Sequence, residues 1–135
     1  MKYLASLILL LVLSASLTAQ IKQQQIDTSN LEDGPYSEYY ENGQVKVEGS
    51  ILNGQWEGPN TYYYSDGKIE SKGFYLNGLP HGTWESYYNT GTPEKKGTYV
   101  NGKWNGRYLW YTRAGRITEK IYRDGEIVRG EKVIG

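Results

Sequence analysis

The sequence predicts an all-β protein: an antiparallel β-meander of four tandem 24-residue β-hairpin repeats that form one twisted, elongated sheet. Three observations predict this fold. Glycines recur every 24 residues, turn dipeptides recur twice in each period, and the runs between them are rich in Tyr, Val, Ile, Thr and Trp. A fixed period of this length indicates a repeat architecture in which each unit is one supersecondary element. Runs of this composition between turns favour strands.

Residues 1–19 have the layout of a secretory signal peptide. Lys2 provides a short basic start, residues 4–13 are apolar, and small residues lead to a cleavage site after Ala19. A membrane anchor is the alternative, but the apolar run is shorter than the about 20 residues that span a bilayer. We therefore expect export to the periplasm, the envelope or the extracellular space. Residues 20–33 are polar and lack a periodic pattern, which predicts a flexible linker.

Four repeat units follow, at residues 34–57, 58–81, 82–105 and 106–128, and residues 129–135 are expected to form a C-terminal tail. The fourth unit is one residue short, as is common for a unit that caps an array. Each unit contains two turn signals, such as "ENGQ" and "LNGQ" in the first. Asn-Gly and Asp-Gly suit a two-residue turn in which both central residues have positive φ. The turn glycines are Gly43, Gly54, Gly67, Gly78, Gly91, Gly102, Gly115 and Gly125.

Pairing across these turns sorts the side chains into two faces. If both turns of the first unit are two-residue turns, Tyr40 lies opposite Val45. Because side chains alternate along a strand, one face is then apolar and aromatic and the other is polar, which supports this register. The expected apolar face of the first unit carries Tyr36, Tyr40, Val45, Val47, Ile51 and Trp56. The expected polar face of the sheet carries Lys46, Glu48, Ser50, Glu57, Glu70, Lys72, Glu85, Glu94 and Lys96.

The same register explains why two glycines, Gly49 and Gly97, stand within strands. Gly49 lies opposite Tyr36, and Gly97 lies opposite Trp84. A ring laid across a cross-strand glycine covers bare backbone and compensates for the missing side chain. We therefore expect these glycines to be structural.

Four tyrosines, one in each unit, interrupt the expected polar face. They are expected to lie opposite, in order, Lys46, Glu70, Glu94 and Thr118. Exposed tyrosines offer a large contact area at low entropic cost, which suits a protein interface. The alternative is that sheet curvature covers this face and that tyrosine is present as a good strand former. The candidate binding residues are Tyr39, Tyr63, Tyr87 and Tyr111, with a second line at Leu52, Leu76 and Val100.

Nothing in the sequence indicates catalysis, a cofactor or a metal. His81 is the one histidine, in a turn-like "LPHG", and there is no cysteine. The acidic residues are scattered without metal-ligand spacing. No phosphate-binding glycine loop appears, because the glycines are accounted for by the 24-residue repeat. The net charge is zero, which argues against nucleic acid as a partner. We expect a protein that is not an enzyme.

The repeats resemble a known family. "GTWESYYNTGTPEKKGTYVNGKWNG" at residues 82–106 is similar to the MORN repeat, and more closely to the variant found in bacterial YwqK-type antitoxin proteins. The resemblance implies a non-enzymatic module that binds another protein, as an exported scaffold or as an antitoxin-like partner that neutralises a toxin. The alternative is a binder of the cell envelope that recognises glycan or lipid through exposed aromatic side chains. The sequence leaves the oligomeric state open.

Overall fold

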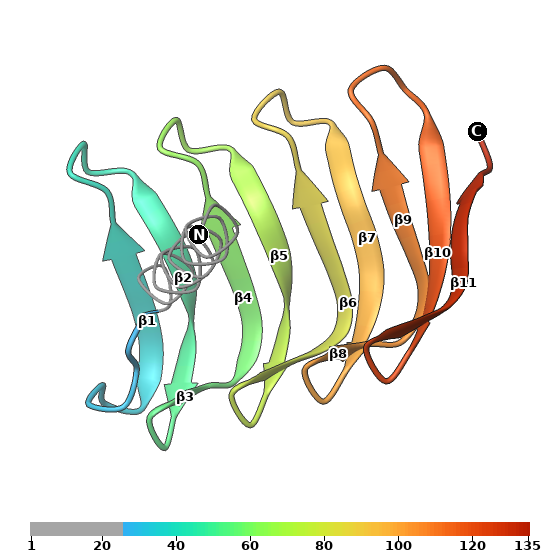
Figure 1. The fold of residues 1–135 in the computed structure, drawn as a ribbon. Helices are drawn as coiled ribbons and strands as arrows, with labels where there is room; N and C mark the ends of the chain where they lie inside the picture. Colours follow the sequence, from blue (N-terminus) through green and yellow to red (C-terminus); the bar gives the residue numbers. More distant parts are fainter. Residues whose placement is uncertain (1–25) are drawn as a thin grey trace, which may run out of the picture.

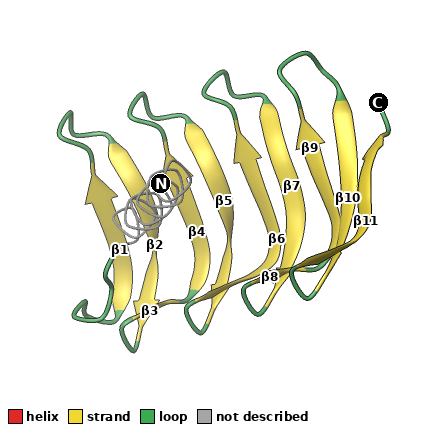
Figure 2. Ribbon diagram, in the orientation of Figure 1, coloured by secondary structure: helices red, strands yellow, loops and turns green. Residues whose placement is uncertain are grey.

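A computed structural model describes residues 26–135, so the predicted signal peptide lies outside the described residues. They form a single antiparallel sheet of 11 strands in which successive hairpins lie side by side in chain order (Figure 1). The described part consists of strands and loops alone (Figure 2). The predicted all-β meander is therefore confirmed. The strands are β1 (Gly34–Tyr39), β2 (Val45–Leu52), β3 (Gln55–Trp56), β4 (Gly58–Tyr63), β5 (Ile69–Leu76), β6 (Leu79–Tyr87), β7 (Pro93–Val100), β8 (Lys103–Trp104), β9 (Gly106–Tyr111), β10 (Ile117–Arg123) and β11 (Glu126–Val133).

The two turns of each unit differ. In the second turn both central residues have positive φ, for example 52° at Asn53 and 69° at Gly54, as the sequence predicts. In the first turn only the glycine does, because Gly43 has a φ of 82° whereas Asn42 is not among the positive-φ residues. The Gly43 N–H donates to the Tyr40 carbonyl at 2.9 Å. The first turn is thus a three-residue loop in which a glycine follows a type I turn, and the prediction of a two-residue turn is wrong there.

The longer loop shifts the register next to it. Tyr39, not Tyr40, lies opposite Val45, while Glu38 lies opposite Val47, so Lys46 is the extra residue of a β-bulge. Glu70 and Glu94 occupy the same bulge position in the next two units. The predicted pairs of Tyr39 with Lys46, Tyr63 with Glu70, and Tyr87 with Glu94 are therefore wrong. The observed partners of the four tyrosines are Val45, Ile69, Pro93 and Ile117.

The fourth hairpin lacks this bulge. Ile117 pairs with Tyr111 and Thr118 with Trp110, without a shift between them. Thr118 is therefore the partner of Trp110 and not, as predicted, of Tyr111. The single residue that the fourth unit has lost is the bulge residue itself.

Nine rings form a continuous chain across one face, which we call the aromatic face. Their centroids lie 3.7–6.5 Å apart, and most pairs meet edge to face, an arrangement that aromatic quadrupoles favour. Because the sheet has one layer, most of these rings are only half-buried. The rings belong to Tyr36, Trp56, Tyr62, Tyr75, Trp84, Tyr99, Trp104, Tyr108 and Tyr122.

Rings cover the strand glycines, although not the rings that the sequence predicts. A Cβ added at Gly97 would lie 2.5 Å from the ring of Trp104, and one at Gly73 would lie 2.1 Å from the ring of Trp84. Trp104 pairs with Tyr99, two residues along from Gly97. Its ring is long enough to reach the diagonal position, so the covering ring comes from the next strand rather than from the register partner.

The second turns stack into a column along one edge of the sheet. The N–H groups of Gly78, Gly102 and Gly125 each donate to a carbonyl of the preceding unit, as Gly78 does to Trp56 at 3.0 Å. A side chain of the preceding unit also accepts from the turn asparagine, as Glu57 does from the Asn77 N–H at 2.8 Å. Asp33 does the same for Asn53 at 2.6 Å. Each unit therefore presents acceptors for the next.

Residues 20–25 of the predicted linker lie outside the described residues, and residues 26–33 lie against the first unit. Ile26 and Leu31 pack on the core of Val47, Ile51 and Trp56. The Thr28 hydroxyl also donates to the Gly54 carbonyl at 2.8 Å. At the other end, the predicted tail begins inside a strand, because β11 continues to residue 133.

Candidate functional site

One row of side chains crosses the whole sheet on the face opposite the rings, which we call the polar face. Cross-strand pairing connects nine residues, one from each long strand, without a break. Paired residues share a face, so the register alone brings together residues that are far apart in the chain. This polar row consists of Ser37, Glu48, Thr61, Lys72, Glu85, Lys96, Leu109, Glu119 and Lys132.

Opposite charges alternate at the centre of the polar row. Glu85 lies 2.9 Å from the Lys96 ammonium and 3.5 Å from that of Lys72. The Tyr87 hydroxyl donates to Glu85 at 2.9 Å, and Lys72 lies over the Tyr87 ring at 5.7 Å. Hydrogen bonds from Lys96 and then from Tyr87 hold the pKa of Glu85 below its usual value. The centre of this face is therefore a network of fixed charges with both signs exposed.

The bulges remove three charges from this face. Lys46, Glu70 and Glu94 are predicted to lie on it, but Lys46 pairs with Glu38 at 2.8 Å and Glu94 accepts from the Ser86 hydroxyl at 3.3 Å. Glu38 is paired with Val47 and Ser86 with Lys95, and all four side chains lie on the aromatic face. The bulge residue turns its side chain to the aromatic face, and this overturns the predicted placement.

The predicted tyrosine ladder lies on the polar face, but only its first member is exposed. Tyr39 is 59% exposed, whereas Tyr63, Tyr87 and Tyr111 are half-buried. Burial, and after it the charge of Glu48, raises the pKa of Tyr63, so this ring lies against the preceding hairpin. Tyr39 has no preceding hairpin, which explains its exposure.

A line of exposed apolar residues runs beside the second turns. Leu52, Leu76 and Val100 are 48%, 37% and 41% exposed, so the structure keeps all three predicted residues at the surface. Leu79 and Phe74 are equally exposed, and the sequence analysis missed both. Leu79 lies directly opposite Leu76, and its place right after a two-residue turn was the available signal.

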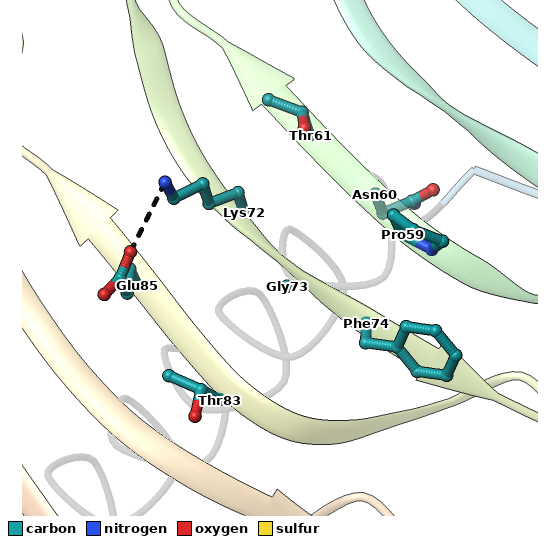
Figure 3. A pocket seen from close by; sticks show the side chains of 8 residues that line it. All are labelled: Pro59, Asn60, Thr61, Lys72, Gly73, Phe74, Thr83 and Glu85. Atoms are coloured by element: carbon teal, nitrogen blue, oxygen red, sulfur yellow. Dashed lines mark ion pairs between the residues drawn. The ribbon is translucent and has the colours of Figure 1, made fainter.

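A shallow hollow of about 390 Å³ lies between the charged centre and the apolar line. Figure 3 shows Lys72 and Glu85 side by side on neighbouring strands, with the Phe74 ring at the other end of the hollow. Such a hollow can accept an apolar side chain at one end and a charged or hydroxyl group at the other. Its lining is completed by Pro59, Asn60, Thr61, Gly73 and Thr83.

The described residues offer no metal site and no membrane-spanning helix. Within residues 26–135, no three side chains of His, Cys, Asp or Glu gather closely enough to hold an ion. The same residues include no helix of the length and apolar character that a membrane span needs. His81, predicted in a turn, lies instead in β6 opposite Phe74. Its Nδ1 is buried without a hydrogen-bond partner among the described residues.

Comparison with known proteins supports the repeat assignment. The family model described as "MORN repeat variant" matches residues 32–53, 56–77 and 80–101. These segments correspond to the first three hairpins, each of which carries the bulge, and the fourth hairpin is not among them. No curated protein sequence matches the chain significantly.

Proposed function

Because residues 32–101 contain three MORN repeat variants, we propose that the chain is a scaffold that binds a partner protein through its polar face. Repeats of this kind are commonly protein- or membrane-binding modules and are generally non-catalytic. The observation that carries the proposal is the unbroken polar row, with alternating charges at its centre. A protein partner suits it best because the face is broad and shallow, whereas small-molecule sites are enclosed.

The chemistry of the face fits an interface with a polar centre and apolar flanks. Tyr39 provides an exposed ring at one corner, and tyrosine is enriched where proteins meet. Leu52, Leu76 and Val100 supply apolar area along the opposite edge. The Lys72, Glu85 and Lys96 charges set orientation, because complementary charges act more on specificity and association rate than on affinity.

The test is partner capture with variants that the fold tolerates. The bait is the full chain, compared with a variant carrying Tyr39→Ser, Leu52→Ser, Leu76→Ser and Val100→Ser, all at exposed positions. A control variant carries Ile127→Ser and Val128→Ser, which are equally exposed but lie on β11. We expect one protein to be retained by the parent and the control and lost by the first variant. Retention by all three baits would contradict binding through the polar face.

The finer proposal is an exported, YwqK-like neutralising partner of a toxin. It is supported by the layout of residues 1–19 and by the resemblance of the repeats. N-terminal sequencing of the protein from the periplasmic or secreted fraction should begin at Gln20. Protein that is found only in the cytoplasm and still begins at Met1 would contradict export. Growth rescue by the chain, when a toxin encoded beside it is expressed, tests the neutralising role.

A second candidate function is envelope binding through the aromatic face. A hollow of about 350 Å³ there is lined by Trp84, Tyr99, Trp104 and Tyr108, with Ser71, Ser86 and Lys95 as polar neighbours. Sugar rings stack on such side chains and hydrogen-bond to such polar groups. Quenching of tryptophan fluorescence by soluble cell-wall glycan, lost in Trp104→Leu, would favour this function over protein binding.

A further inference from the structure

The aromatic face has an edge, along the first turns, where tyrosines join successive hairpins. Each of the first three hairpins places one tyrosine hydroxyl on a backbone carbonyl of the next hairpin. These hydrogen bonds hold three rings in a row, one ring per hairpin. The donors and acceptors are Tyr40 and Tyr63 at 2.7 Å, Tyr64 and Tyr87 at 2.7 Å, and Tyr88 and Tyr111 at 2.9 Å.

The last ring of this row is covered by a cation from the chain itself. The Arg113 guanidinium lies 4.7 Å from the centroid of the Tyr88 ring, within the range of a cation–π interaction. Tyr88 is accordingly buried, at 9% exposure. Arg113 follows the strand of the fourth hairpin, so the cation reaches back onto the ring of the hairpin before it.

No lysine or arginine of residues 26–135 lies over the ring of Tyr40 or Tyr64 in this way. The positions 24 and 48 residues before Arg113 are Asn89 and Ser65, and neither side chain is charged. Tyr64 and Tyr40 are correspondingly only half-buried. The chain thus fills one of three equivalent places and leaves two open.

A carboxylate lies beside the first of the two open rings. Glu70 lines a hollow of about 490 Å³ together with Tyr40, Tyr62 and Lys46. Glu70 is exposed to solvent, but desolvation by its neighbours, and after it the charge of Glu94, raises its pKa. Burial and then the charge of Glu70 raise the pKa of Tyr40 and also of Tyr64, so this negative charge acts on both open rings.

Glu70 also lacks a cation of its own. Among residues 26–135 it takes part in none of the salt bridges. The nearby Lys46 is already paired with Glu38 at 2.8 Å. A ring and an unpaired carboxylate side by side favour a guanidinium or ammonium group.

We propose that this row binds a segment of a partner protein in the extended polyproline II conformation that carries arginine or lysine at every third residue. The spacing follows from the sheet. Rings two strands apart are separated by about 9.6 Å. Three residues of a polyproline II helix make one turn that spans about 9.3 Å, so side chains three residues apart lie on the same side. Basic side chains at positions i and i+3 therefore reach Tyr40 and Tyr64 as Arg113 reaches Tyr88. This inference goes beyond the proposed function, because it concerns the opposite face and names the chemistry of the ligand.

The first test compares two labelled peptides by fluorescence anisotropy with the full chain. One peptide has arginine at every third position and serine elsewhere. The other has the same length and the same number of arginines, placed at every second position in its first part and followed by serine. We expect the first peptide to bind at least about tenfold more tightly. Equal affinity of the two peptides, or no binding of either at millimolar concentration, would overturn the proposal.

The second test introduces arginines into the chain itself, at the positions that correspond to Arg113 in the second and third hairpins. The double variant Ser65→Arg with Asn89→Arg places guanidinium groups where Arg113 stands in the last unit, and it should weaken binding of the first peptide at least about tenfold. A matched control, Val128→Arg with Val133→Arg, adds the same charge at exposed positions of β11 and should bind within about twofold of the parent. Unchanged binding by the Ser65→Arg, Asn89→Arg variant would overturn the assignment, whatever the outcome of partner capture on the polar face.

Discussion

Gly73 tests how the rings and the strand glycines fit together. In the variant Gly73→Ala, the new Cβ would lie 2.1 Å from Cδ2 of Trp84, well inside van der Waals contact. Gly73 is not among the residues with positive φ, so alanine meets no backbone strain there. The effect of the substitution is therefore the displacement of Trp84 alone.

The cost can be worked from what Trp84 contacts. Its ring centroid lies 5.2 Å from Tyr75, 6.2 Å from Tyr99 and 6.4 Å from Tyr62. An aromatic pair contributes about 0.5–1.5 kcal/mol, and overpacking costs about 1–3 kcal/mol. Loss of one or two pairs together with crowding lowers the free energy of unfolding by about 2–5 kcal/mol. The melting temperature should then fall by roughly 10 °C or more.

Thermal unfolding followed by near-ultraviolet circular dichroism measures both the melting temperature and the environment of the rings. Gly130→Ala is the matched control, because a Cβ at Gly130 has no atom within 4 Å and the residue has no positive φ. We expect the control to melt with the parent. Equal melting temperatures for Gly73→Ala and Gly130→Ala would refute the reasoning that rings are seated on strand glycines.

Further predictions concern the rings, the hydroxyl row, the turns and the charges. Trp104→Ala should lower the free energy of unfolding by about 2–4 kcal/mol, whereas Lys96→Ala, at an exposed ion pair, should change it by less than about 1 kcal/mol; matching urea midpoints for the two would contradict the face assignment. Tyr88→Phe should cost about 1 kcal/mol through loss of its hydrogen bond to a backbone carbonyl, measured in the same way. Asn101→Ala should cost about 1 kcal/mol, because φ there is 48° and alanine is strained in that region. Lys96 holds the pKa of Glu85 below its usual 4.5. The stabilisation that the ionised Glu85 gives the folded state is therefore complete above pH 4.5 and is lost as the pH falls through the lowered pKa. The melting temperature of Glu85→Gln should accordingly fall less on acidification than that of the parent.

The fold was predictable because the 24-residue grid appears four times in one chain. The second turns followed from Asn-Gly and Asp-Gly, which tolerate two successive positive φ values. The first turns did not, because "ENGQ" fits either turn type. Thr90 and Ala114 occupy the central position in later copies, and neither residue suits positive φ. They were the available sign that only the glycine is left-handed in this turn.

The exposure of the candidate site residues was predictable only in part. Tyr39, Leu52, Leu76 and Val100 were assigned to the surface from alternation alone, and they are exposed. The burial of the later tyrosines depends on contact with the preceding hairpin. The alternation of side chains within one hairpin gives no information about that contact. The bulge at Lys46 was equally hidden, because it becomes visible only when the fourth unit, one residue shorter, is seen to pair without it.

The column of second turns also bears on how such a molecule changes over evolutionary time. The second, third and fourth hairpins meet the hairpin before them through the same backbone contact, such as the Gly78 N–H on the Trp56 carbonyl. A duplicated unit inserted between two hairpins would therefore find both of its docking surfaces already made. Every duplication lengthens the sheet by about 9.6 Å and adds one more tyrosine step and one more pair of residues to the polar row. Gene duplication can thus change the length of partner segment that the sheet is able to bind, and it needs no new type of contact between hairpins.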